Sequence, residues 1–174
     1  MGDIIKRIWQ ESPVLGERDL IFVTVGGMRA FERLVREMDR IAGELDEQVV
    51  MQLGSTDYEP KNCEYFRFMP RRDIEKCYAG ASVIVCHAGT GSVLTALEHN
   101  KPLVLVPRMK RYGEVFDDHQ LEIAREMESR GVTAVYDISN LQSALKNLDM
   151  SPVEFKSETT LVHRLIEYLD QVKK

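Results

Sequence analysis

Residues 20–27, LIFVTVGG, decide the fold class of this chain. The side chains of a strand alternate between the two faces of its sheet, so an unbroken apolar run is buried on both faces. Parallel sheets that carry helices on each side bury their strands in this way. In residues 31–45 the apolar side chains step by three and four, which predicts an amphipathic helix directly after the strand.

The alternation of apolar strand and amphipathic helix continues along the chain. Further strands are predicted at residues 49–53, 65–68, 83–86, 103–106 and 133–135. Further helices are predicted at residues 72–78, 92–99, 118–130, 141–148 and 159–172. This alternation is typical of an α/β domain with a parallel sheet. We therefore expect one Rossmann-like domain over residues 19–174, preceded in residues 1–18 by a short helix and a linker.

Composition and charge exclude several classes of protein. A chain of 174 residues suits one domain, and its net charge of −5 argues against a nucleic-acid partner. No apolar run approaches the roughly 20 residues of a membrane-spanning helix, and no signal-peptide pattern is present. Cys63, Cys77 and Cys86 fit no metal or redox spacing, and we expect them to be buried free thiols. We expect a cytoplasmic protein, or one that is peripheral on the cytosolic face of a membrane.

The loop of residues 87–92, HAGTGS, is the strongest candidate site. Ligands of parallel α/β sheets bind beyond the carboxyl ends of the strands, and this loop joins a buried strand to a helix. Its glycines let the backbone approach a ligand closely, and free N–H groups at a helix start bind phosphate oxygens. We expect Ser92 to cap that helix. The loop therefore indicates an anion or diphosphate site, although a plain glycine-rich connection would have the same composition.

Three other segments near predicted strand ends carry weaker signals. Gly26-Gly27 suits a turn that passes close to a ligand. In Asp118-His119-Gln120 the aspartate suits a helix cap, and the other two suit hydrogen bonds to a polar ligand such as a sugar. A helix cap followed by ordinary surface residues would have the same sequence. The segment 108–111, RMKR, carries three basic residues. It suits contact with anionic lipid or a lipid diphosphate, but an ordinary solvated loop could have the same composition.

Four segments, taken in order, resemble the C-terminal domain of family 28 glycosyltransferases. They are VTVGG (23–27), HAGTGS (87–92), NKPLVLVPR (100–108) and GEVFDDHQ (113–120). The resemblance covers about residues 20–130 and is strongest to small single-domain members. Among these are the catalytic subunit of the two-subunit dolichol-diphosphate GlcNAc transferase and bacterial polysaccharide subunits. The resemblance implies the C-terminal half of a GT-B glycosyltransferase.

The resemblance also implies a chemistry and a set of site residues. The implied reaction is an inverting transfer from a UDP-sugar without a metal ion or any other cofactor. The implied diphosphate ligands are Gly26, Gly27, Ala88, Gly89, Thr90, Gly91 and Ser92. The implied contacts to sugar or nucleoside are Phe68, Met69, Thr95, Glu98, Asp118, His119 and Gln120. His87 is a candidate general base, with contact to donor or phosphate as its alternative role.

One position departs from the family pattern. Many relatives place a ribose-binding glutamate where this chain has Thr95, and Glu98 lies about one helical turn later. The departure supports an alternative function, a non-catalytic nucleotide-sugar-binding regulatory subunit. Epimerases that share the fold carry both domains in one longer chain, so the length argues against that activity.

The resemblance finally implies a partner. GT-B enzymes close two domains around the donor, and this chain has room for one. In the small relatives the acceptor half is a separate membrane-anchored subunit, and the acceptor is a lipid-linked sugar. Two apolar stripes are candidate docking elements. They are Ile4, Ile8 and Trp9 near the start of the chain, and Leu161, Leu165, Leu169 and Val172 near its end.

Overall fold

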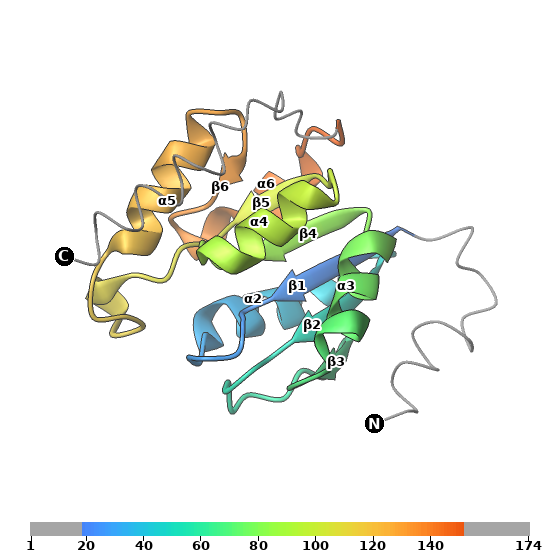
Figure 1. Ribbon diagram of the computed structural model, residues 1–174. Helices are drawn as coiled ribbons and strands as arrows, with labels where there is room; N and C mark the ends of the chain where they lie inside the picture. Colours follow the sequence, from blue (N-terminus) through green and yellow to red (C-terminus); the bar gives the residue numbers. More distant parts are fainter. Residues whose placement is uncertain (1–18, 152–174) are drawn as a thin grey trace.

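The computed structural model describes residues 19–151, which form a parallel sheet with helices on both faces (Figure 1). The strands are β1 (Leu20–Thr24), β2 (Gln48–Gln52), β3 (Glu64–Phe66), β4 (Val83–Cys86), β5 (Leu103–Leu105) and β6 (Thr133–Ala134). Their order is β3-β2-β1-β4-β5-β6, and every pairing is parallel. The predicted α/β domain with a parallel sheet is confirmed.

Helices connect the strands. They are α2 (Glu32–Ala42), α3 (Arg71–Gly80), α4 (Thr90–Glu98), α5 (His119–Glu128) and α6 (Leu141–Lys146), with 3₁₀ turns η1 (Lys110–Tyr112) and η2 (Ile138–Asn140). The helix and linker predicted for residues 1–18, the helix predicted for residues 159–172 and the two apolar stripes they carry lie outside the described residues. No helix within residues 19–151 is long and apolar enough to cross a membrane.

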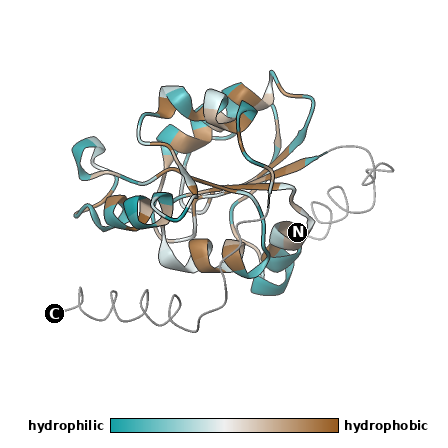
Figure 2. Ribbon diagram, turned by 90° about the horizontal axis from the view of Figure 1, so that it is seen from above, coloured by the Kyte–Doolittle hydropathy of each residue, from teal (hydrophilic) through white to brown (hydrophobic). Residues whose placement is uncertain are grey.

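Two apolar clusters, one on each face of the sheet, hold the helices in place. Phe22 of β1 belongs to the cluster under α3, α4 and α5, whereas its neighbour Val23 belongs to the cluster under α2 and α6. Neighbouring side chains of a strand point to opposite faces, which is why the apolar run of β1 is unbroken. Figure 2 shows the hydrophobic strands in the centre, between the two layers of helices. Each fully buried side chain of this size contributes roughly 1.5–3 kcal/mol.

The strand order reverses at the centre of the sheet. β1 pairs with β2 on one side and with β4 on the other, so Thr24 lies beside both Gln52 and Cys86. The chain winds outward from β1 to β3, returns to β4 and then winds outward to β6. Because all strands run in parallel, the loops after β1 and β4 leave the sheet side by side. We call this side the carboxyl edge and the opposite side the amino edge.

Some boundaries differ from the prediction. The strand predicted at residues 65–68 ends at Phe66, and Arg67 instead donates to the backbone carbonyls of Thr56 and Asp57 in the loop after β2. The segment between β5 and α5, where no helix was predicted, contains η1. Helix α5 ends at Glu128, two residues before the predicted end. Gly131 has a φ of +91°, a left-handed conformation that lets the chain leave the helix.

The three cysteines are free thiols. Cys77 and Cys86 are buried, as predicted, whereas Cys63 is only half-buried. Burial raises the pKa of Cys63 to about 12 and that of Cys77 to about 11, and it also raises the pKa of Cys86. All three are therefore protonated at neutral pH and are poor nucleophiles.

Candidate functional site

The two glycine-rich segments predicted to hold a diphosphate meet at the carboxyl edge. Gly26-Gly27 follows β1, and residues 87–92 follow β4, the strand beside it. The backbone N–H of His87 donates to the carbonyl of Thr24 at 3.3 Å, which ties the two loops together at their bases. The site therefore forms at the point where the strand order reverses, which is where ligands of this sheet type bind.

The imidazole of His87 packs against glycines of both loops. A Cβ atom at Gly26 would lie 2.8 Å from His87 Cε1, and one at Gly89 would lie 2.2 Å from His87 Nε2. Real Cβ atoms do not approach so closely, so the ring occupies the space that side chains at these two positions would need. Gly26 also has a φ of +70°, a conformation that suits glycine.

His87 is neutral at physiological pH. Burial lowers its pKa to about 4, with a smaller contribution from the positive charge of Arg108. Its Nδ1 lies 3.5 Å from the carbonyl oxygen of Thr24, which can only accept a hydrogen bond. This contact places the proton on Nδ1 and leaves Nε2 as a hydrogen-bond acceptor. A group with so low a pKa is a weak general base at neutral pH.

Helix α4 begins at the loop after β4 without a side-chain cap. Gly89 is the N-cap residue, and the helix starts at Thr90, earlier than predicted. Ser92 thus lies inside the first turn, and the prediction that it caps the helix is wrong. The first N–H groups of a helix lack partners within it and carry partial positive charge. At α4 these groups belong to the predicted diphosphate loop.

Thr95 and Glu98 lie further along α4. The hydroxyl of Thr95 donates to the carbonyl of Gly91 at 2.9 Å, within the helix itself. Glu98 is the last residue of α4 and is exposed, about 12 Å along the axis from Thr90. The structure therefore places the candidate replacement for the family's glutamate far from the helix start.

Phe68 reaches the carboxyl edge from the segment after β3. A Cβ atom at Gly27 would lie 3.6 Å from Phe68 Cε1, so the ring stands beside the loop after β1. The side chain is 56% exposed, whereas Met69 is half-buried and packs on the core cluster under α3. Phe68 thus offers a partly open aromatic face next to the predicted diphosphate loop.

Asp118, His119 and Gln120 lie at the start of α5 and mainly organise the segment after β5. Asp118 Oδ1 accepts from the backbone N–H of Lys110 at 2.9 Å, and Gln120 Oε1 accepts from that of Arg108 at 3.0 Å. The predicted cap by the Asp118 side chain is wrong, because Asp118 is bound elsewhere. His119 remains partly exposed, with Nδ1 3.4 Å from Glu122.

The basic residues 108–111 do not form one exposed surface. The side chain of Arg108 is only 3% exposed, and Met109 is also buried. The prediction that this segment faces lipid is therefore wrong for Arg108, whereas Lys110 and Arg111 are exposed. Sequence reasoning named Arg108 only as part of this exposed segment and did not predict its burial against the loop after β1. The available signal was its position, directly after an apolar strand and Pro107 at the carboxyl edge.

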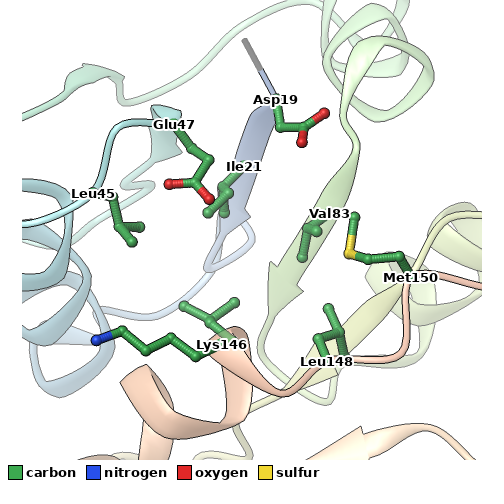
Figure 3. Close-up of a pocket in the computed structure, with 9 residues that line it drawn as sticks. Asp19, Ile21, Leu45, Glu47, Val83, Lys146, Leu148 and Met150 are labelled. Atoms are coloured by element: carbon green, nitrogen blue, oxygen red, sulfur yellow. The ribbon is translucent and has the colours of Figure 1, made fainter.

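A cavity of about 360 Å³ lies at the amino edge, away from the glycine-rich loops. Its walls come from the beginnings of β1 and β4 and from α6 and the residues after it. Figure 3 shows the apolar side chains of Ile21, Val83 and Leu148 turned towards this space, with Asp19 and Glu47 among its other residues. The described residues contain no group of three or more His, Cys, Asp or Glu arranged to hold a metal ion.

The model of the glycosyltransferase family 28 C-terminal domain matches residues 20–169. The chain belongs to this family. The resemblance inferred from four segments of sequence is thus confirmed.

Several curated relatives are N-acetylglucosamine transferases by name. The UDP-N-acetylglucosamine transferase subunit ALG13 of Candida albicans is 32% identical over 92 residues, covering 53% of this chain and 30% of that protein. The UDP-N-acetylglucosamine–N-acetylmuramyl-(pentapeptide) pyrophosphoryl-undecaprenol N-acetylglucosamine transferase of Chlorobaculum parvum is 29% identical over 129 residues, covering 70% and 34%. The chain thus spans about a third of each of these relatives.

Solved structures share the fold. The solution structure of ALG13 superposes with a TM-score of 0.58 at 19% identity, covering 87% of this chain and 96% of that one. MurG of Acinetobacter baumannii superposes with a TM-score of 0.56 at 19% identity, covering 75% and 41%. These likenesses show that the described residues have the fold of the C-terminal domain of GT-B glycosyltransferases.

Proposed function

We propose that this chain is the donor-binding, catalytic subunit of a UDP-sugar glycosyltransferase, with GlcNAc as the transferred sugar. The observation that carries the proposal is the meeting of Gly26-Gly27 with the uncapped start of α4 at the point where strand order reverses. Family membership and the names of the relatives support the same activity.

The geometry suits departure of a nucleoside diphosphate. Transfer of the sugar builds negative charge on the diphosphate, and the N–H groups of Thr90, Gly91 and Ser92 at the start of α4 are preorganised donors for it. Gly26 and Gly27 have no side chain that would keep the diphosphate from their backbone. Such donors supply charge stabilisation without a metal ion, as we propose for this enzyme.

We assign the remaining predicted residues by their positions. The exposed face of Phe68, with the backbone at Met69, suits contact with the nucleoside base. His119 suits contact with the donor sugar, while Asp118 and Gln120 hold its loop in place. The unprotonated Nε2 of His87 suits acceptance of a hydrogen bond from a hydroxyl of the donor or acceptor.

We further propose that the reaction inverts the anomeric centre and needs a second polypeptide. We propose that the base for the acceptor hydroxyl comes from this partner, because the low pKa of His87 makes it a weak base at neutral pH. The MurG-type relatives are about three times the length spanned here. The partner would be membrane-anchored and would present a lipid-linked sugar at the cytosolic face of a membrane.

Thr95 favours a second candidate function, a nucleotide-sugar-binding subunit without catalysis. Its hydroxyl is occupied within α4, and Glu98 lies far from the helix start, so neither offers the ribose contact that many relatives have. This subunit would bind UDP but would support no transfer with any partner.

A thermal-shift screen against UDP, UDP-GlcNAc, UDP-GlcA, UDP-Glc, UDP-Gal and GDP tests the proposal. A ligand at about 100 times its dissociation constant adds roughly 2.7 kcal/mol to the free energy of unfolding. We expect the uridine compounds to raise the melting temperature and GDP to leave it unchanged. Absence of any shift with UDP would contradict donor binding by this chain. Transfer of labelled GlcNAc in the presence of the partner then separates catalysis from binding alone.

A further inference from the structure

The side chain of Arg108 crosses from the end of β5 to the loop after β1. Its Nη2 donates to the carbonyls of Val25 at 2.7 Å and Arg29 at 2.6 Å, and its Nε donates to that of Ala30 at 3.3 Å. Val25 lies at the beginning of this loop, and Arg29 and Ala30 lie at its end. One buried guanidinium therefore fixes the loop of residues 25–30 from both sides.

No carboxylate neutralises Arg108 directly. Glu114 is the acidic group whose charge acts on it, yet Glu114 is bound by Arg33 at 2.7 Å and by the backbone N–H of Met109 at 2.9 Å. None of the ion pairs among residues 19–151 includes Arg108. Burial lowers its pKa to about 10, so the group keeps its proton at neutral pH.

A second guanidinium strengthens this local excess of positive charge. Arg33 and Arg108 both lie over the ring of Phe31, with centroid distances of 5.2 and 4.7 Å. Nη1 of Arg33 is buried without a hydrogen-bond partner among the described residues. Two cations thus share one carboxylate, Glu114, beneath the loop after β1.

The part of the loop that Arg108 encloses is open to a ligand. Met28 is 95% exposed, and within residues 19–151 no hydrogen bond uses the backbone N–H of Gly27 or Met28. The carbonyls at both ends of the loop point to Arg108, while the donors between them remain available. A buried cation that holds carbonyls on one side of a loop leaves its N–H groups free for an anion.

We propose that Arg108 is a positioning residue for the donor diphosphate. Its guanidinium fixes the loop of residues 25–30 in the conformation that receives the diphosphate, and the bound diphosphate balances its charge. The inference rests on the proposed function and deepens it, because it names the residue that holds the loop of residues 25–30 in place.

Titration calorimetry of the full chain with UDP and with uridine tests the inference. Hydrogen bonds to charged groups contribute more free energy than those between neutral groups. Their loss in Arg108→Gln is therefore expected to weaken UDP binding by about 10- to 100-fold. Uridine lacks the diphosphate, so its affinity is expected to change by less than about threefold. A purely structural role would weaken both ligands alike, and that result would overturn the inference.

Two further variants keep the test decisive. Arg108→Lys retains the charge but lacks the planar fork, so we expect a loss of UDP affinity of about 3- to 10-fold. If Arg108→Gln fails to fold, Arg108→Lys tests the positioning role by itself. Unchanged UDP binding by Arg108→Lys would overturn that role. Arg67→Gln is the matched control, since Arg67 likewise donates to loop carbonyls, but after β2. It is expected to change UDP affinity by less than about threefold.

The wild-type chain separates this inference from the proposed function. A wild type that binds UDP, with an Arg108→Gln variant that binds it equally well, overturns the inference alone. A wild type that binds neither UDP nor uridine contradicts the proposed function, and the inference falls with it.

Discussion

The carboxyl edge and the amino edge belong to one sheet but are built in opposite ways. At the carboxyl edge the backbone is so crowded that Cβ atoms at Gly26, Gly54 and Gly89 would overlap their neighbours. At the amino edge apolar side chains such as Ile21 and Leu148 surround a cavity of about 360 Å³. The candidate site is thus at the crowded edge, where backbone donors and buried cations gather, whereas this apolar cavity lies at the other edge.

The difference teaches that a site for a charged ligand and an apolar cavity need different walls. A diphosphate is held by directed N–H groups and positive charge, and these require backbone segments to approach one another closely. Glycines permit that approach. Apolar walls at the amino edge offer few such donors. We therefore expect substitutions at the two edges to change the free energy of unfolding in different ways.

The largest effect is expected from Gly54→Ala at the carboxyl edge. Gly54 has a φ of +53°, and a Cβ there would lie 2.2 Å from the carbonyl oxygen of Gly26, a backbone atom that cannot move aside alone. Left-handed strain and the clash together are expected to lower the free energy of unfolding by about 4 kcal/mol in urea denaturation.

Gly91→Ala is the matched control for this substitution. Nothing lies within 4 Å of a Cβ at Gly91, which sits in the first turn of α4. Alanine is the better helix former, so stability is expected to rise by up to about 1 kcal/mol. Equal losses from both variants would show that crowding of the carboxyl edge does not limit the fold.

The next effect concerns pH and His87. The folded chain holds His87 neutral down to a pH of about 4, whereas the unfolded chain protonates it below its ordinary pKa of 6.5. The unfolded state therefore binds more protons in this window, so the stability that neutral His87 contributes is complete above pH 6.5 and is lost as the pH falls to about 4. The loss amounts to about 3 kcal/mol.

His87→Asn isolates this contribution from the carboxylates that titrate nearby. Denaturation of both proteins from pH 7 to pH 4 is expected to show the wild type losing about 3 kcal/mol more than the variant. Parallel profiles for the two proteins would mean that His87 is not held neutral by its surroundings.

The smallest effect is expected at the amino edge. Val83 lines the cavity, so Val83→Ile adds a methylene group to empty space and is expected to raise the free energy of unfolding by up to about 1 kcal/mol. Val85, two residues along the same strand, is fully buried, and Val85→Ile is expected to lower it by about 1–3 kcal/mol. Thermal denaturation measures both. A loss at Val83 as large as that at Val85 would show that the cavity is not open to side chains.

Much of the fold could be predicted because its signals are local. The apolar run at residues 20–25 needs burial on both faces, and that requirement alone indicates a parallel sheet between helices. Gly131 marked the end of α5 for an equally local reason. Helix caps were harder, since α4 starts at Thr90 and the Asp118 carboxylate is drawn away to Lys110.

Arg108 shows why the rest of the site could not be predicted. A basic residue in a polar segment is usually solvated, and its burial here depends on carbonyls about 80 residues away along the chain. The packing of His87 between Gly26 and Gly89 likewise joins segments that only the sheet brings together. The sequence predicted that the glycine-rich loops form a site, but it did not predict that Arg108 is buried against one of them.

The central place of β1 has a consequence for the order in which the protein is made. Its partner β4 lies about 60 residues further along the chain, so at ribosomal rates of 5–20 residues per second β4 emerges about 3–12 s after β1. During that interval one side of β1 has no strand to pair with, and an apolar edge is open to other nascent chains. The candidate site needs the loops after both strands, so it forms only once β4 has been made and has paired with β1.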